Sequence, residues 1–224
     1  MLFQSTHQSP RTALTIFAHP DDAEISCFGF LTKLRKQGWR VVVLIVTRGE
    51  NGADPTECDR RNEAKAAADL IGAELVFGDF PDGFVARNSE LITWLEEVLE
   101  AERPDVIVTH HVGESRIAHQ DHVAVEAAVQ IAVRRAHWTP TLLLAEGPDN
   151  DPGFRPNWFV DISDEFETKL EAIGLHLSQG RKHYMQPDYQ DLRSRRWGLS
   201  VFAGRDRPGI HAHWEAYFLA QQVN

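Results

Sequence analysis

The sequence contains little cysteine, and this scarcity limits what the protein can be. Only Cys27 and Cys58 occur among 224 residues, and two cysteines outside a CxxC pair cannot build a disulfide framework. The chain also lacks any apolar run close to the ~20 residues that a membrane-spanning helix needs. Its first residues show neither the charged start nor the apolar stretch of a signal peptide. We therefore expect a cytoplasmic protein without a membrane span.

An excess of basic residues is missing as well. The chain has 23 Lys and Arg against 33 Asp and Glu, a formal net charge of −10, which argues against a general nucleic-acid-binding protein. A small polar or anionic substrate stays compatible with this balance. Its 42% hydrophobic and 25% charged residues are ordinary for a soluble globular protein. No repeat or low-complexity segment divides the chain, so we expect one domain over residues 1–224.

Short apolar runs alternate with helical patterns along most of the chain. Strands are expected at residues 12–18, 41–47, 74–78, 105–110 and 141–147, with a possible sixth at 158–163, and helices at 23–37, 58–71, 88–102, 119–137 and 164–177. This alternation predicts an α/β fold with a mostly parallel β-sheet that is flanked by helices on both faces. The remaining tail, rich in Arg, Trp, Gly and Pro, receives no assignment.

Polar clusters follow the expected strands at the point where each strand ends. They occur at residues 19–22, 47–50, 82–83 and 110–111, and the last of these leads into the cluster at 119–122. In open α/β sheets, ligands bind beyond the carboxyl ends of the strands, close to a switch in strand order. The sequence therefore predicts a functional site at the carboxyl ends of the strands.

His19, Asp22 and His122 are a plausible set of three metal ligands. Imidazole nitrogen and carboxylate oxygen suit zinc, Zn²⁺, and three protein ligands leave a position open for water. The same ligands would accept iron(II) or cobalt(II). Asp21 adjoins Asp22 but points differently from the same turn, so it could take a proton from that water as the general base.

His119 lies one helical turn before His122, so both rings can face one pocket. We expect His119 to stabilise an oxyanion or to protonate a leaving amine. Asp121 could fix the tautomer of one of these histidines from behind. Glu50, after the second strand, is a polar candidate for contacting the substrate.

Each cluster by itself has a simpler interpretation. Asp21 and Asp22 could cap a helix and interact with its dipole, and His-x-x-His occurs by chance on many helices. His110 and His111 could merely line the floor of a pocket at the end of their strand. The combination of both clusters on one rim of the sheet favours the metal site.

The segments AHPDDAEISCFGFLTKLRKQGWRVVVLIVTRGENG, RRNEAKAAADLIGAE, DFPDG and HQDH together resemble the PIG-L/LmbE-like family of zinc-dependent N-deacetylases. The resemblance spans nearly the whole chain and implies a Rossmann-like fold. It also implies hydrolysis of an N-acyl amide, usually an acetyl group on an amino sugar, with zinc as the cofactor.

The resemblance assigns roles position by position. His19, Asp22 and His122 match the metal ligands of the family, and Asp21 matches its general base. His119 matches the histidine that stabilises the tetrahedral intermediate. Asp121 matches the aspartate that supports this histidine.

Arg60 and Asp82 fall where family members contact the sugar or its aglycone, although a structural salt bridge explains Arg60 equally well. The chain departs from the family pattern at two places. Ser26-Cys27-Phe28-Gly29-Phe30 replaces a glycine-rich stretch, and Ile117 stands where many members have an aspartate. Neither departure removes an expected metal ligand.

The sequence leaves three functions open. The first is a deacetylase acting on an amino sugar, and the second a metal-dependent amidohydrolase acting on a non-sugar N-acyl compound. The third is a catalytically silent binding protein of the same fold. The tail aromatics could form the interface of a homo-oligomer, a lid over the pocket, or a cover for the sheet edge; they are Trp197, Phe202, Trp214, Tyr217 and Phe218.

Overall fold

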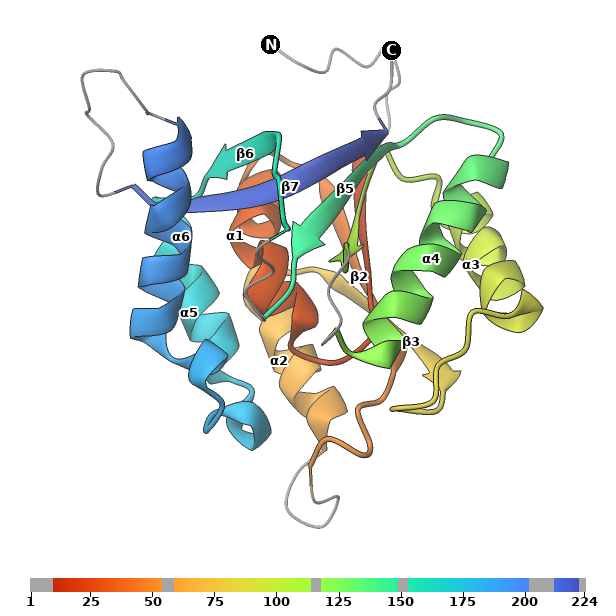
Figure 1. Ribbon diagram of the computed structural model, residues 1–224, viewed down its shortest axis with the longest axis horizontal. Helices are drawn as coiled ribbons and strands as arrows, with labels where there is room; N and C mark the ends of the chain where they lie inside the picture. Colours follow the sequence, from red (N-terminus) through yellow and green to blue (C-terminus); the bar gives the residue numbers. More distant parts are fainter. Residues whose placement is uncertain (1–9, 54–58, 114–117, 149–152, 202–211, 222–224) are drawn as a thin grey trace.

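The apolar runs form a seven-stranded sheet in the computed structural model (Figure 1). The structure describes residues 10–53, 59–113, 118–148, 153–201 and 212–221. The strands are β1 Thr12–Phe17, β2 Arg40–Thr47, β3 Glu74–Phe80, β4 Val106–His111, β5 Thr141–Glu146, β6 Trp158–Asp161 and β7 Trp214–Gln221. Their order across the sheet is β3-β2-β1-β4-β5-β7-β6.

The strand pairing is parallel from β3 through to β5. β7 then pairs antiparallel with β5 on one side and with β6 on the other, so the expected mostly parallel sheet is confirmed. The chain runs outward from β1 to β3 in one direction and from β4 to β5 in the other. The order therefore switches between β1 and β4, which is the position where open α/β sheets bind their ligands.

Helices cover both faces of the sheet. They are α1 Asp22–Lys36, α2 Arg60–Ile71, α3 Ser89–Glu102, α4 Gln120–Arg135, α5 Phe166–Gly174 and α6 Pro187–Val201, with short 3₁₀ helices η1 Leu177–Gln179 and η2 His183–Met185. One hydrophobic core lies under α1 and α2, and a second lies under α3 and α4. Along β1, Ala13 and Phe17 face the first core whereas Leu14 and Ile16 face the second. This two-sided burial explains why the strand sequences are continuously apolar.

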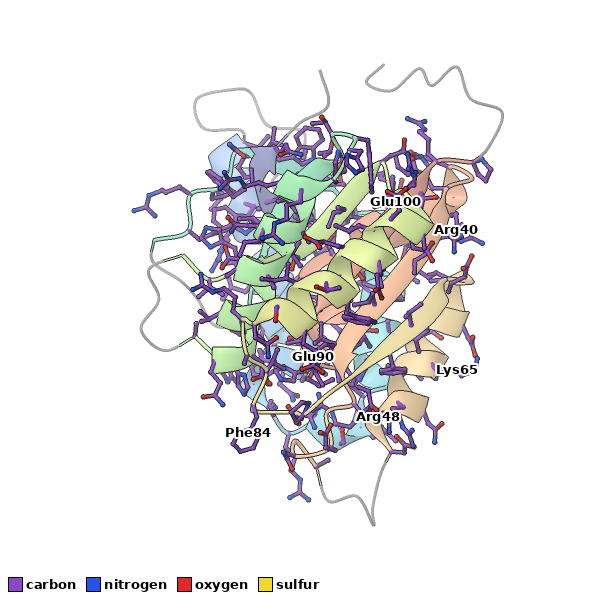
Figure 2. All side chains as sticks on the ribbon, turned by 90° about the vertical axis from the view of Figure 1, so that its right-hand side faces the viewer. Arg40, Arg48, Lys65, Phe84, Glu90 and Glu100 are labelled. Carbon is purple, nitrogen blue, oxygen red and sulfur yellow. The ribbon has the colours of Figure 1, made fainter. Side chains whose placement is uncertain are left out.

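The two ends of the parallel strands are far apart in the molecule. Figure 2 shows Arg40, which begins β2, at one end and Arg48, which follows β2, at the other. Phe84 lies at the same end as Arg48, and 73% of its surface is exposed. The turns that carry the polar clusters therefore share the end marked by Arg48 and Phe84.

The unassigned tail contains α6 and β7. β7 lies inside the sheet, where Tyr217 is fully buried in the first core, and Phe218 is partly exposed. Trp197 on α6 donates a hydrogen bond to the carboxylate of Glu146 over 3.2 Å. These three aromatic residues thus help to complete the fold, whereas Phe202 lies outside the described residues.

A buried carboxylate accepts hydrogen bonds from the backbone of α1 near the middle of the helix. Glu215 on β7 accepts hydrogen bonds from the backbone N–H groups of Gly29 at 3.0 Å and Phe30 at 2.8 Å. It also accepts from Lys169 at 2.6 Å and from the Tyr217 hydroxyl at 2.8 Å. A side chain that reaches into the i to i−4 ladder is an established cause of helix bending. We call Glu215, Lys169 and Tyr217 the α1 clamp.

None of the helices in the described part of the chain combines the length and the apolar composition that crossing a membrane requires.

Candidate active site

The turns after β1 and β4 meet in a cavity at the switch in strand order. The cavity has a volume of about 230 Å³. Its lining residues are His19, Asp21, Asp22, Ile25, Asn51, Gly52, Arg60, Asp82, Gly83, His119, His122, Pro148, Lys182 and Tyr184. The two histidine and acid clusters of the sequence, about a hundred positions apart, therefore share one site.

The turn between β1 and α1 holds Asp21 in an unusual conformation. Asp21 has a φ of 113°, in a region that side chains other than glycine rarely adopt and that stores strain. It occupies the N-cap position of α1, yet its carboxylate accepts no capping hydrogen bond. The side chain lies instead 3.3 Å from the guanidinium of Arg60. Helix capping therefore does not explain this aspartate.

Potential ligand atoms of three side chains lie close together. His19 Nδ1 lies 3.2 Å from His122 Nε2. Of the two Asp22 carboxylate oxygens, Oδ2 lies 3.5 Å from His19 Nδ1 and Oδ1 lies 3.3 Å from His122 Nε2. In a tetrahedral zinc site with bonds of about 2.0 to 2.1 Å, neighbouring ligand atoms are about 3.3 Å apart. The geometry is thus that of a candidate His/Asp metal site.

Two other histidines lie close to these side chains, but each already has a backbone partner. His110 is buried and stacks on the His122 ring at 4.0 Å, and its Nε2 accepts the N–H of Ala18 at 3.0 Å. His119 is the N-cap of α4, and its Nδ1 accepts the N–H of Asp121 at 3.2 Å. These nitrogens therefore have no free lone pair to offer, whereas Nε2 of neutral His119 carries a proton that it can donate.

The far side of the His19 ring contacts two carboxylates. Its Nε2 lies 3.0 Å from Asp121 and 3.1 Å from Asp82. Burial lowers the pKa of His19, but hydrogen bonds with Asp121, Asp22 and Asp82 outweigh it and raise the pKa to about 11. A carboxylate behind a ligating histidine fixes the ring and its tautomer. The cluster thus holds His19 with Nδ1 directed towards Asp22 and His122.

Asp121 occupies a different place from the one expected for it. Its carboxylate contacts His19 rather than a histidine of its own helix, and it also accepts the N–H groups of Gly83 at 2.7 Å and Val85 at 3.0 Å. Asp121 is fully buried. It therefore joins the start of α4, the turn after β3 and the end of β1 in one network.

The residues expected to contact substrate are partly engaged within the protein. Asp82 accepts the N–H of Asn51 at 2.9 Å, and Glu50 accepts the N–H of Asp82 at 2.8 Å. Glu50 is exposed and does not line the cavity. These contacts join the loops that follow β2 and β3, and Asp82 still borders the cavity.

The buried Arg60 faces Asp21 and also donates to the Pro20 carbonyl. Burial and the adjacent charge of Asp22 raise the pKa of Asp21 to about 6, although the charges of Arg60, His176 and Lys182 act in the opposite direction. A carboxyl group with this pKa is ionised at neutral pH and can both accept and return a proton. Of the two roles that the sequence left open for Arg60, the structure shows the salt bridge, which Arg60 forms with Asp21.

Several residues of the cavity wall were not identified from the sequence, Lys182 and Tyr184 among them. Lys182 and Tyr184 come from the segment around η1 and η2, for which no element was expected. Each is a common surface residue without a motif around it, so only its proximity to the site reveals it. His110 was considered, but its stacking on His122 depends on the contact between β4 and α4.

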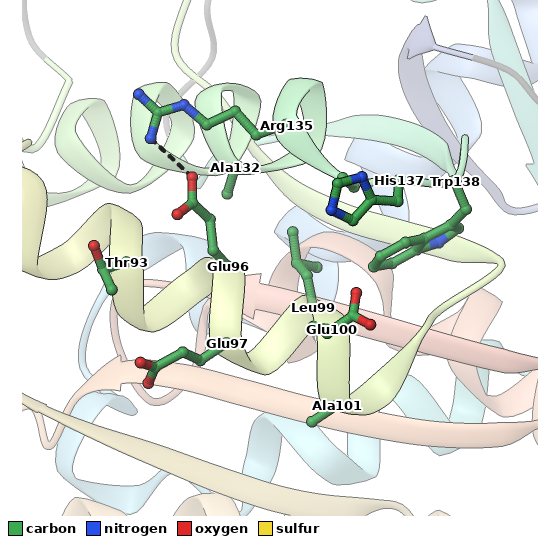
Figure 3. A pocket seen from close by; sticks show the side chains of 11 residues that line it. Thr93, Glu96, Glu97, Leu99, Glu100, Ala101, Ala132, Arg135, His137 and Trp138 are labelled. Carbon is green, nitrogen blue, oxygen red and sulfur yellow. Dashed lines mark hydrogen bonds and ion pairs between the residues drawn. The ribbon is translucent and has the colours of Figure 1, made fainter.

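A larger cavity of about 830 Å³ lies away from these residues (Figure 3). It is formed between α3 and α4 and is lined by Glu96, Leu99, Glu100, Arg135 and Trp138 among others. Arg135 pairs with Glu96 at 2.8 Å. His137 and three glutamates line it, but among the described residues they form no group that could hold a metal ion. Size therefore does not identify the candidate site in this protein.

Comparison with known proteins finds a matching family model and deacetylase relatives. The family model described as PIG-L, GlcNAc-PI de-N-acetylase, matches residues 14–133. The uncharacterized deacetylase YaiS of Escherichia coli K12 is 31% identical over 170 residues, covering 74% of this chain and 90% of that protein. The diacetylchitobiose deacetylase of Thermococcus kodakarensis is 30% identical over 188 residues, covering 75% and 70%.

One similar structure belongs to an enzyme with a different reaction. GalB, the 4-carboxy-2-hydroxymuconate hydratase of Pseudomonas putida KT2440, superimposes with a TM-score of 0.77 at 21% identity, covering 96% of this chain and 99% of that one. At that identity the likeness shows the shared fold alone. The chemistry must therefore be argued from the site.

Proposed function

The chain belongs to the PIG-L family, and we propose that it is a metal-dependent de-N-acetylase of an N-acetylated amino sugar or amino-sugar conjugate. The convergence of His19 Nδ1, His122 Nε2 and the Asp22 carboxylate beside Asp21 carries this proposal. Two relatives named above are deacetylases, one of them acting on an amino-sugar substrate.

These three residues fit a divalent metal. Their atoms have the mutual distances of tetrahedral ligands, and the acid side chains around them leave an excess of negative charge. His19 also has carboxylates behind it, as metal-binding histidines commonly do. We therefore assign His19, Asp22 and His122 as ligands, with zinc as the first choice because of the nitrogen and oxygen donors.

A bound divalent metal would polarise the amide carbonyl and lower the pKa of a water molecule towards ~7. Asp21 accepts the proton of the attacking water, and Arg60 holds the Asp21 carboxylate in place from 3.3 Å. Asp21 then returns the proton to the leaving nitrogen, a step that its pKa of about 6 favours. Acetate and a free amine are the products.

His119 stabilises the negative charge that develops on the carbonyl oxygen. Burial, together with the neighbouring His19 and His122, lowers the pKa of His119, so its ring is neutral at pH 7. Its Nδ1 is occupied by the backbone of Asp121, which leaves the Nε2 proton to face the substrate. Preorganised donors of this kind act where charge develops in the transition state.

The proposal is tested by measuring acetate release from N-acetylglucosamine, its glycosides and a non-sugar N-acetyl amide, using the purified zinc-loaded protein. Asp21→Asn should lower kcat by a factor of about 10² to 10⁴ while one equivalent of zinc stays bound. Asp79→Asn is the matched control, because the Asp79 side chain is 86% exposed and pairs with Arg48, outside the cavity lining.

The pattern of activity separates the alternatives. Release from the non-sugar amide alone would identify the second function left open by the sequence, and bound zinc without any release would favour a binding protein. Hydration of 4-carboxy-2-hydroxymuconate without acetate release would refute the deacetylase proposal. Normal turnover of Asp21→Asn would refute the assigned base.

A further inference from the structure

Lys182 places a positive charge on the wall of the active-site cavity. Its side chain lines the cavity together with Tyr184, and its Nζ lies 5.5 Å from the centre of the Tyr184 ring. Among the described residues, no carboxylate forms an ion pair with Lys182. This ammonium group is therefore available to a ligand.

The segment that carries Lys182 is tied to both sides of the site. Gln179 is almost fully buried, and its side chain donates to the Gly52 carbonyl at 3.1 Å. Glu63 on α2 accepts the N–H of Ser178 at 2.8 Å and its hydroxyl at 2.7 Å. These bonds fix the backbone that precedes Lys182 relative to the rest of the cavity, so the position of the charge is built into the fold.

The other cation of the lining has a different task. Arg60 is buried, and its guanidinium is occupied by the Asp21 carboxylate and the Pro20 carbonyl. The described floor of the cavity is otherwise rich in carboxylates, in a chain with a net charge of −10. Lys182 is therefore the cation of the cavity wall that no described carboxylate neutralises, and it can bind an anionic group of a ligand.

The size of the cavity indicates which part of a substrate meets Lys182. Its volume of about 230 Å³ is below the ~300 to 1,000 Å³ usual for drug-sized ligands. It can enclose an acetamido group and about one sugar ring, so a larger substrate must extend past the rim. Lys182 lines the cavity and is also exposed to solvent. It thus lies beside the path of the substituent that leaves the cavity.

We propose that Lys182 binds an anionic group, a carboxylate or a phosphate, on the part of the substrate that lies beyond the N-acetylated sugar. This inference rests on the proposed deacetylase function and narrows its substrate class to amino sugars with an anionic aglycone. The ammonium ion forms a charge-assisted hydrogen bond with such a group. The bond adds affinity and takes no part in the cleavage of the amide.

Three substrates with the same sugar provide the test. They are the methyl glycoside of N-acetylglucosamine, the carboxymethyl glycoside, and N-acetylglucosamine 1-phosphate. We expect kcat/KM of the zinc-loaded wild type to be on the order of tenfold higher for at least one anionic substrate, mainly through a lower KM, and this preference to shrink with added salt. The anion that is preferred distinguishes carboxylate from phosphate.

Substitution of Lys182 isolates its contribution. Lys182→Gln should remove the preference for the anionic substrate, and Lys182→Glu should reverse it, with much smaller changes for the methyl glycoside. Arg181→Gln is the matched control, because Arg181 is an exposed neighbour that does not line the cavity. Equal losses on neutral and anionic substrates, or a wild type without any preference, would overturn the inference.

A binding measurement separates this inference from the proposed function. The three compounds are titrated into zinc-loaded Asp21→Asn with and without Lys182→Gln. The wild type could release acetate from none of the compounds, while the anionic ones bind Asp21→Asn about tenfold more tightly only when Lys182 is present. In that case the deacetylase proposal fails and the anion site stands. Equal binding of all three compounds would overturn the anion site.

Discussion

Two buried charged clusters contact α1, one at its first residue and one near its middle, and they differ in how completely their polar groups are paired. In the α1 clamp, the Glu215 carboxylate receives hydrogen bonds from two backbone N–H groups, Lys169 and Tyr217. In the metal-site cluster, by contrast, His19 Nδ1, His122 Nε2 and the Asp22 carboxylate face each other. The polar groups of the α1 clamp are paired within the fold, whereas the metal-site cluster brings potential ligand atoms of three side chains together.

This difference separates structural from functional buried charge. Buried polar groups are normally paired within the fold, because leaving them unpaired costs free energy. A cluster in which hydrogen bonds orient several potential ligand atoms towards one another suits a bound cation. The metal-site cluster comes from residues inside the 14–133 match to the family model, whereas the clamp comes from residues after it. Residues after the family match thus anchor α1, and the first residue of α1 is the proposed metal ligand Asp22.

Of the changes considered, breaking the α1 clamp should have the largest effect, which is a loss of stability. Glu215→Gln leaves the Lys169 ammonium group buried beside a neutral partner, which should lower the free energy of unfolding by about 3 to 5 kcal/mol. Chemical denaturation monitored by circular dichroism measures the change.

The exposed pair of Lys65 and Asp69 on α2 provides the control for the clamp. Asp69→Asn removes an ion pair of the same type from a solvated helix surface, so the free energy of unfolding should change by about 0.5 kcal/mol or less. Similar effects of Glu215→Gln and Asp69→Asn would contradict the structural role of the clamp.

A smaller effect is expected when a carboxylate behind the metal site is neutralised. Asp121→Asn keeps the shape of the side chain but weakens the bond that orients His19, so zinc affinity should fall by about 10- to 100-fold. Competition with a chromogenic chelator measures the affinity. Asp105→Asn is the control, because Asp105 accepts the N–H of Thr12 at the opposite end of the strands; a loss of affinity there would point to general destabilisation.

The smallest expected effect is the dependence of zinc affinity on pH. Because the pKa of His19 is about 11 without metal, its ring is protonated at pH 7 to 9, and zinc must displace the Nδ1 proton. Binding should therefore release about one proton, and zinc affinity should rise by about tenfold for each pH unit in this range. Calorimetry in buffers with different ionisation enthalpies counts the protons. Release of none would mean that His19 binds zinc without competition from a proton.

Much of the fold was predictable because it depends on local patterns. Continuous apolar runs indicated the strands that are buried on both faces, such as β2, and their alternation with helices indicated the parallel sheet. β7 was not predictable, because its place between β5 and β6 arises from pairing with residues 53 to 79 positions earlier in the chain. The same holds for α6, whose Arg193 and Trp197 donate hydrogen bonds to Glu146, 47 and 51 positions earlier in the chain.

The site was predictable to a similar extent. His19, Asp22 and His122 were selected because each stands in a compact motif at the end of an expected strand or the start of an expected helix. The side chains around them were harder to assign. Asp121 contacts His19 instead of a histidine of its own helix, and Arg60 faces Asp21, because both contacts depend on how three separate loops pack together.

The sequence by itself determined the class of fold, the end of the sheet that carries the site, and the chemical types of its residues. Strand periodicity and ligand chemistry are local properties, so they can be read from neighbouring residues. Only the tertiary structure decided which atoms lie close together, which ring nitrogens the backbone already occupies, and that Lys182 lines the cavity without an ion pair to any described carboxylate. Those outcomes depend on distances between segments that the order of residues does not specify.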